Sequence, residues 1–108
     1  MNETAEHLYA RQARVIQAMA HPIRLAIVDC LREGEVCVCE IAERVGAERS
    51  NVSRHLALMT TAGVLASRQE GLKVFYRLKC PCILRFLSCI DTVLKEQLAE
   101  TRAVLSRL

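Results

Sequence analysis

Apolar residues recur at helical spacing through most of the chain and alternate with polar residues only between positions 64 and 78. A spacing of three and four residues predicts helices, and the expected ranges are 3–19, 23–32, 38–45, 49–62 and 81–107. Proline and glycine residues between these ranges agree with the expected helix ends. Pro22 suits the first turn of a helix, and Gly34 and Gly46 suit left-handed helix ends. The pattern therefore predicts helices in series.

The alternating segment predicts a β-hairpin with its turn at Glu70-Gly71. A helix-turn-helix over about 37–62, followed by a hairpin over 64–78, is typical of a winged helix-turn-helix. We therefore expect a mainly α fold with a small β-hairpin wing, in the order of four helices, two strands and one last helix. No repeat or linker divides the chain, so residues 1–108 are expected to form a single DNA-binding and dimerisation domain.

The fourth expected helix combines an apolar side with a polar, basic one. Val52, Leu56 and Met59 follow the i, i+4, i+7 spacing of a buried side. The outward positions at its start are Arg49, Ser50, Asn51, Ser53, Arg54 and His55. Such a face can enter a major groove, where Asn pairs with adenine and Arg with guanine. Arg68 and Lys73, near the hairpin tip, are expected to contact phosphates or the minor groove. The alternative is an ordinary solvated face.

Charge and size support a DNA-binding dimer. The net charge is only +3, but six Lys or Arg residues and one His lie between positions 44 and 77, against two Glu. This concentration suits a polyanion. A chain of 108 residues buries only about two-thirds of its unfolded surface. The last helix presents a wide apolar surface that needs a partner, so we expect it to pack with the first helix in an isologous homodimer.

Several protein classes are disfavoured. No apolar run approaches the ~20 residues that span a bilayer, and the start of the chain is acidic rather than signal-like. We therefore expect a cytoplasmic protein without a membrane partner, whose six cysteines serve as thiols rather than as disulfides. No C-x-x-C beside a βαβ pattern and no phosphate loop is present, which argues against an enzyme.

Four stretches in order carry a family resemblance: AHPIRL at 20–25, EVCVCEIA at 35–42, NVSRHL at 51–56 and GLKVFYRL at 71–78. The sequence resembles the ArsR/SmtB family of winged-helix metal-sensing repressors. The resemblance implies a homodimer that binds a palindromic operator in double-stranded DNA, beside its own gene or an efflux gene. It also implies that an inducer ion releases the operator.

The first of two C-x-C pairs, Cys37 and Cys39, looks like the start of the motif of arsenite-sensing relatives. The third thiol position of that motif holds Ala42. Residues two apart in a helix project about 200° apart, so both sulfurs can meet one ion only if the helix start is distorted. The alternative interpretation is two small, half-buried apolar side chains.

The second pair, Cys80 and Cys82, occupies positions where zinc- and cobalt-sensing relatives place an aspartate and a histidine. Cys89 is the candidate third thiol, but it lies about 10.5 Å further along an intact helix. Either the helix start unwinds or Cys89 comes from the partner subunit. Three thiolates suit As(III) or Sb(III), with Cd(II) or Pb(II) as the nearest alternative, and no organic cofactor is expected. We expect the helix dipole to favour a thiolate at Cys82.

A redox mechanism is the alternative to an ion. Some relatives sense persulfide or oxidants through one cysteine in the second helix and one in the last, and Cys30 and Cys89 hold such positions. Cysteines that simply pack in a dimer interface are a further alternative. Among the histidines, His21 is expected to cap a helix and His55 to face DNA.

Overall fold

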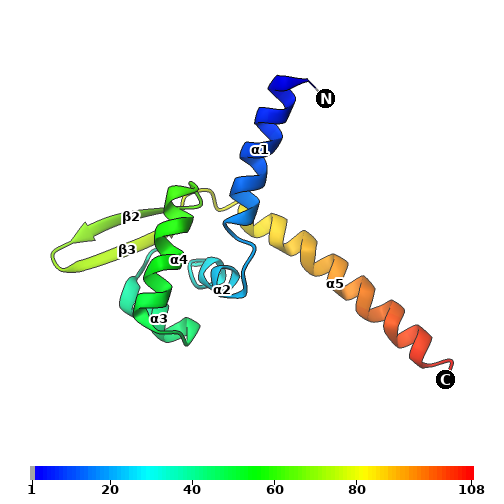
Figure 1. The fold of residues 1–108 in the computed structure, drawn as a ribbon. Coiled ribbons are helices and arrows are strands. Elements are labelled where there is room, and N and C mark those ends of the chain that lie inside the picture. The colour runs from blue at the N-terminus through cyan, green and yellow to red at the C-terminus, as the bar shows by residue number, and fades with distance from the viewer. Residues whose placement is uncertain (1) are drawn as a thin grey trace.

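The computed structural model describes residues 2–108 and contains five helices and three strands within them (Figure 1). In chain order they are α1 (Glu3–Gln17), α2 (Pro22–Cys30), β1 (Val36–Cys37), α3 (Val38–Val45), α4 (Arg49–Thr61), β2 (Leu65–Glu70), β3 (Lys73–Leu78) and α5 (Ile83–Leu105). The mainly α winged helix-turn-helix expected from the sequence is confirmed. The additional strand β1 was not expected.

Local hydrogen bonds explain where the helices begin and end. The Asn2 side chain accepts a hydrogen bond from the Ala5 amide at 2.8 Å and so caps α1. His21 Nδ1 accepts from the Ile23 amide at 3.1 Å, which confirms His21 as the cap of α2. Gly46 closes α3 with φ 73°, a left-handed conformation that costs glycine little.

The core lies where α2, α3 and α4 meet the base of the wing. Its largest fully buried side chains are Ile27, Leu31, Ile41, Leu56, Met59 and Leu65. Val52, Leu56 and Met59 form the buried side of α4, as expected. Leu25, an apolar residue of α2, is 40% exposed. It lies two residues before Ile27, and a rotation of about 200° places it on the opposite side of α2.

The three strands form one antiparallel sheet in the order β1-β3-β2. In this sheet Cys37 pairs with Phe75, and Phe75 pairs on its other side with Arg68. The strand β1 therefore joins the segment ahead of α3 to the wing. Two residues are too few to show an alternating pattern, so the sequence alone did not predict this strand.

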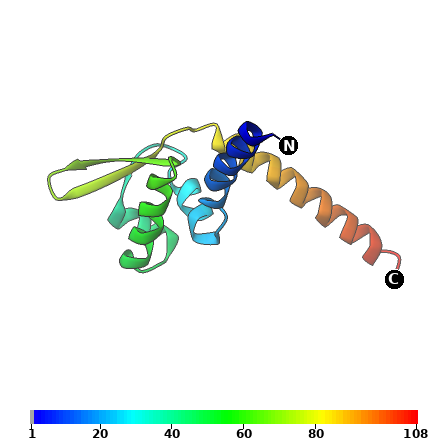
Figure 2. The same cartoon turned by 45° about the horizontal axis from the view of Figure 1, so that its top comes forward.

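The first and last helices project away from the winged core (Figures 1 and 2). Neither α1 nor α5 contains a buried residue. The start of α5 differs from the expectation, because the helix begins at Ile83 rather than Pro81 and leaves Cys80–Cys82 in a turn. Over residues 2–108, no helix has both the length and the apolar character needed to cross a bilayer.

Candidate nucleic-acid interface and thiol sites

The start of α4 presents a polar, basic surface. Arg49, Ser50, Ser53 and Arg54 are exposed there, while Asn51 is half-buried. Arg54 Nη2 donates to Asn51 Oδ1 at 3.1 Å, so the two side chains orient each other. This contact leaves the Asn51 amide nitrogen and the other guanidinium donors of Arg54 available. The arrangement can present donors to the edges of bases in a major groove.

We predict that Arg54→Ala weakens binding to a cognate operator by roughly 1–3 kcal/mol and relaxes sequence preference at one base pair, because a bidentate contact with guanine is lost. Competition binding with operator variants measures both effects. Unchanged operator affinity would show that this face of α4 does not read the bases.

His55 was expected to share that surface, but its side chain contacts α2. Its ring is half-buried and lies 4.6 Å, between centroids, from the ring of His21. Its Nδ1 accepts a hydrogen bond from Arg24 Nε at 3.1 Å. Burial, followed by the positive charges of His21, Arg24 and Arg54, lowers the pKa of His55 below its ordinary value. The contact with α2 gives His55 a packing role, and its contact with DNA stays a prediction.

The lowered pKa of His55 predicts a pH-dependent stability. Because the unfolded chain binds the proton more tightly than the folded one, the free energy of unfolding should fall as the pH drops below about 6.5. Urea unfolding at pH 7.5 and at pH 5.5 measures the loss. His55→Gln should lose less stability between these two values, and an equal loss in both proteins would contradict the assignment.

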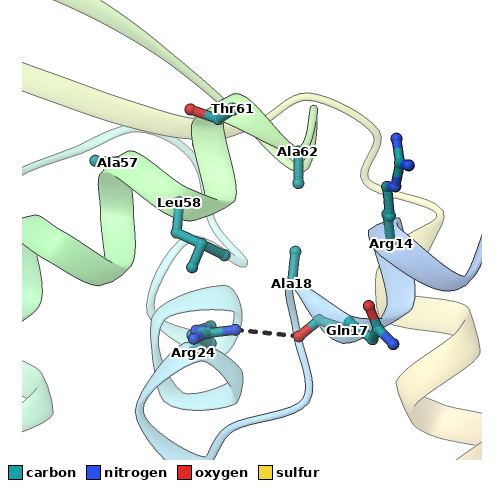
Figure 3. Close-up of a pocket in the computed structure, with 8 residues that line it drawn as sticks. All are labelled: Arg14, Gln17, Ala18, Arg24, Ala57, Leu58, Thr61 and Ala62. Carbon is teal, nitrogen blue, oxygen red and sulfur yellow. Dashed lines mark hydrogen bonds between the residues drawn. The ribbon is translucent and has the colours of Figure 1, made fainter. Parts of the chain in front are cut away.

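Arg24 was missed by sequence reasoning, although it lies within the matching stretch at 20–25. Besides its bond to His55, its Nη1 donates to the Gln17 carbonyl at 3.1 Å. Figure 3 shows this contact beside a hollow lined by Arg14 and Gln17 of α1, by Ala18 just after it, and by residues of α4 such as Leu58. Arg24 therefore ties α2 to the end of α1 and to α4, and it positions α4 rather than extending its outward face.

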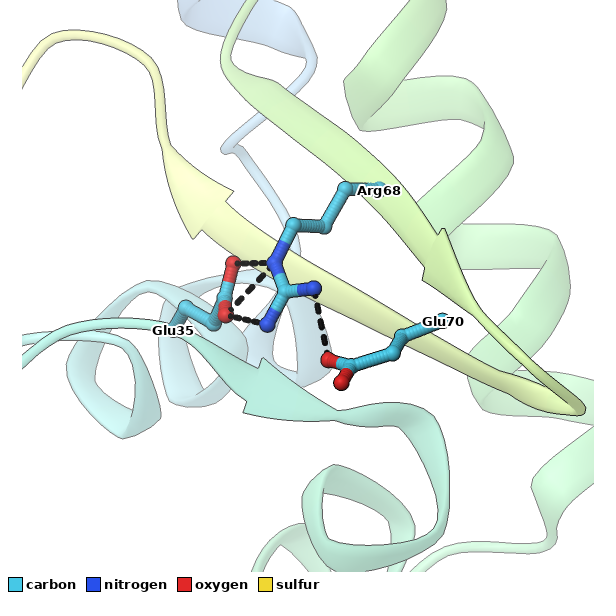
Figure 4. A network of polar contacts seen from close by, with 3 residues as sticks. All are labelled: Glu35, Arg68 and Glu70. Atoms are coloured by element: carbon cyan, nitrogen blue, oxygen red, sulfur yellow. Dashed lines mark hydrogen bonds and ion pairs between the residues drawn. The ribbon is translucent and has the colours of Figure 1, made fainter.

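Arg68, expected near the tip of the wing, is held by two carboxylates (Figure 4). Its Nε lies 2.8 and 2.9 Å from the two Glu35 oxygens, and its Nη1 lies 2.8 Å from Glu70 Oε2. The guanidinium also lies over the Phe75 ring, 4.7 Å from its centroid. Arg68 holds the pKa of Glu35 below its usual range. Lys73 is exposed and has no ion pair within the described chain.

The first thiol pair straddles the start of α3. Cys37 is half-buried in β1, with an extended backbone of φ −76° and ψ 155°, and Cys39 is exposed in the first turn of α3. Cys37 therefore lies outside the helix, and helical geometry does not fix the angle between the two side chains. Their sulfurs are not in contact in the part of the chain that the structure describes.

The second thiol pair converges. Cys80 Sγ and Cys82 Sγ lie 2.8 Å apart, and both side chains are exposed. The turn before α5 permits this approach, since neither residue is within the regular helix. Contact with the Cys80 thiol, and then desolvation, raise the pKa of Cys82. The direction is opposite to the one expected from the helix dipole, because Cys82 precedes the helix and faces another thiol.

The remaining cysteines stand apart from that pair. Cys89 is exposed within α5, and Cys30 ends α2 with Arg44 Nη1 3.9 Å from its sulfur. Burial raises the pKa of Cys30, an effect that Arg44 opposes. Within residues 2–108 of one subunit, no three His, Cys, Asp or Glu side chains gather as a ligand set. Cys89 is therefore not gathered with Cys80 and Cys82 in this part of the chain.

Comparisons with known proteins agree with the winged helix-turn-helix fold. The family model described as "Bacterial regulatory protein, arsR family" matches residues 21–67. The uncharacterized HTH-type transcriptional regulator Rv0081 of Mycobacterium tuberculosis is 35% identical over 105 residues, which cover 96% of this chain and 92% of that protein. The arsenical resistance operon repressor of Escherichia coli is 39% identical over 66 residues, or 60% of this chain and 56% of that protein.

Among solved structures, the homodimeric winged helix-turn-helix DNA-binding domain Mb0332 of Mycobacterium bovis, a possible ArsR-family regulator, matches with a TM-score of 0.79. The match covers 93% of each chain at 29% sequence identity. The fold, the polar and basic start of α4, and these similarities lead to one conclusion. The chain belongs to the ArsR family of DNA-binding transcriptional regulators and is not an enzyme.

Proposed function

We propose that the protein is a homodimeric repressor that leaves its operator when As(III) or Sb(III) binds Cys80, Cys82 and Cys89 of the partner subunit. The observation that carries this proposal is the contact between the two exposed sulfurs in the turn ahead of α5. Two thiols already side by side need little rearrangement to bind one thiophilic ion. The similarity to the arsenical resistance operon repressor of Escherichia coli supports As(III) as the ion, and the choice of Cys80 and Cys82 over Cys37 and Cys39 rests on the contact between their sulfurs.

Dimerisation is supported by the unpartnered apolar side chains of α1 and α5. The exposed large apolar residues on these two helices are Leu8, Tyr9, Val15, Ile16, Phe86, Ile90, Val93, Leu94, Leu98, Val104 and Leu105. A set this extensive on a protein surface marks an interaction site, and an isolated helix is only marginally stable in water. An isologous interface would cover both helices in each subunit.

The donor set selects the ion. Arsenite, As(OH)₃, reacts with three thiols to form three As–S bonds and releases three water molecules, so As(III) is satisfied by three sulfurs. Zn(II) prefers four ligands, and soft thiolates favour thiophilic ions in general. Within one subunit Cys89 lies about 10.5 Å further along the chain than Cys82 at helical rise. A partner's Cys89 removes that constraint.

Ion binding would act on the geometry of the dimer. Cys80 and Cys82 lie between the end of β3 and the start of α5, where the winged core meets the proposed dimerisation helix. An ion bound by both this turn and the partner's α5 would fix the angle between the winged core and the dimerisation helices. Paired recognition helices must meet half-sites about 34–36 Å apart, so a changed angle would lower operator affinity.

Titration of a preformed operator complex with arsenite tests the proposal. We expect the DNA to be released at micromolar arsenite. Parallel titrations with antimonite, cadmium and lead compare the other candidate ions. Retention of the complex at saturating arsenite would remove the As(III) assignment, and release by Cd(II) or Pb(II) alone would reassign the inducer.

The redox alternative through Cys30 and Cys89 has less support. The two residues lie on α2 and α5, and their sulfurs are not in contact in the described part of the chain. The raised pKa of Cys30 also lowers the fraction of reactive thiolate. An oxidant would have to join sulfurs that the fold keeps apart.

A further inference from the structure

One face of the wing sheet carries a row of interacting side chains. Cys37, Phe75 and Arg68 are direct partners across β1, β3 and β2. Residues directly opposite one another in a sheet project to the same face, as do residues two apart in one strand. Glu70 thus shares this face with Arg68, and Glu35, just ahead of β1, reaches Arg68 from the other edge of the sheet (Figure 4).

The Arg68 guanidinium is engaged by carboxylates on all three of its nitrogens. All three of its nitrogens contact carboxylate oxygens: Nε and Nη2 contact Glu35, and Nη1 contacts Glu70. Its flat face covers the Phe75 ring at 4.7 Å. Arg77 also lies close enough to act on Glu35, so two cations face two carboxylates and the charge of Arg68 is matched within the cluster. A DNA phosphate approaching Arg68 would have to compete with the two carboxylates that already hold its guanidinium.

The cluster also joins segments that are distant in sequence. Glu35 immediately precedes β1, which leads into α3, and Arg68 lies 33 residues later in the wing. A single exposed ion pair contributes little, but a two-pronged contact combined with cation–π stacking fixes an orientation. The contact therefore sets the angle of the wing relative to the helix-turn-helix.

We propose that Arg68 and Glu35 are positioning residues that hold the wing for DNA binding, and that Lys73 is the wing cation that contacts phosphate. The inference relies on DNA binding by the family and is independent of the inducer. It replaces the expectation that Arg68 itself touches DNA.

Operator titrations over a range of salt concentrations test the proposal with Glu35→Gln, Arg68→Ala and the double variant. We expect each single variant to weaken binding by roughly tenfold, as is typical of contacting pairs. The double variant should be no weaker than either single one. The slope of log affinity against log salt should stay unchanged in all three, whereas Lys73→Ala should reduce it by about one.

The opposite results would overturn the proposal. If Arg68 contacts phosphate, Glu35→Gln should tighten binding, since it removes a competing negative charge, and Arg68→Ala should reduce the salt slope by about one. Arg68→Lys further separates positioning of the wing from contact with phosphate, because lysine keeps the positive charge but lacks the planar guanidinium that contacts two carboxylates at once. We expect it to bind as weakly as Arg68→Ala, and near-normal binding would contradict us. Thermal melts establish whether each variant is folded. If Arg68→Ala does not fold, the sign of the change in operator affinity caused by Glu35→Gln still decides between the two roles.

Discussion

Replacing Cys80 and Cys82 together with serine should make the repressor uninducible. The operator complex of this variant should persist at arsenite concentrations that dissociate the wild-type complex completely. The physical reason is that serine hydroxyls are hard donors and do not replace thiolates on a soft ion. Fluorescence anisotropy of labelled operator DNA during an arsenite titration measures the difference directly.

The matched control is Cys37→Ser/Cys39→Ser, which removes the same number of thiols from the start of α3. We expect this variant to release DNA as the wild type does, because its two sulfurs are not in contact. If instead the Cys37/Cys39 variant were uninducible and the Cys80/Cys82 variant normal, the inducer site would lie at the start of α3. Loss of response in both would indicate two coupled sites.

Glutamate at Ile90 should separate the dimer and lower operator affinity by about a hundredfold or more. Ile90 lies on α5 one helical turn after Phe86 and one before Leu94, so all three lie along one side of the helix. An isologous interface would bury the new carboxylate twice without a partner, which is costly. A monomer would also lose the gain in affinity that linked domains have on a palindrome, which is of the order of 10²–10⁴.

Light scattering during size exclusion gives the oligomeric state of Ile90→Glu, and operator titration gives its affinity. The winged core should stay folded, because α5 packs against it through Ile83, Leu84 and Leu87, whereas Ile90 is exposed. Leu108→Glu is the matched control, since Leu108 is 98% exposed at the end of the chain and carries the same change. A dimeric Ile90→Glu protein that binds DNA normally would place the subunit interface elsewhere.

The helices and the hairpin could be predicted because their signals are local. Pro22, Gly46 and the regular apolar spacing act within a few residues, so they are visible in the sequence. The strand β1 could not be predicted, because two residues carry no period and the strand exists only through its pairing with β3. Leu25 is apolar but 40% exposed, because the rotation of the helix, and not the residue type alone, decides which side chains are buried.

The site was less predictable than the fold because its contacts join distant residues. Arg68 and Glu35 are 33 positions apart, and His55 and Arg24 are 31 apart. No periodic pattern links such pairs, so both Arg68 and His55 looked like free DNA-facing groups. The basic, exposed start of α4 was predictable, since its position follows directly from the buried spacing of Val52 and Leu56.

The second thiol pair depended on where α5 begins. A helix starting at Pro81 would place Cys80 and Cys82 at its first turn and aim the dipole at Cys82. The structure starts α5 at Ile83, and the resulting turn brings the two sulfurs together and raises the pKa of Cys82. A shift of two residues in a helix boundary thus changes the chemistry of the pair.

A mixed dimer tests the shared site most directly. One subunit carries Cys80→Ser/Cys82→Ser and the other carries Cys89→Ser, with different affinity tags for purification of the mixed species. If Cys89 acts across the dimer, the mixed dimer keeps one complete set of three thiols, whereas neither homodimer keeps any.

We predict that arsenite binds this mixed dimer at one ion per dimer and that both homodimers bind it far more weakly, as measured by metal analysis after desalting. A mixed dimer that binds no more arsenite than its parent homodimers would contradict a site built from both subunits.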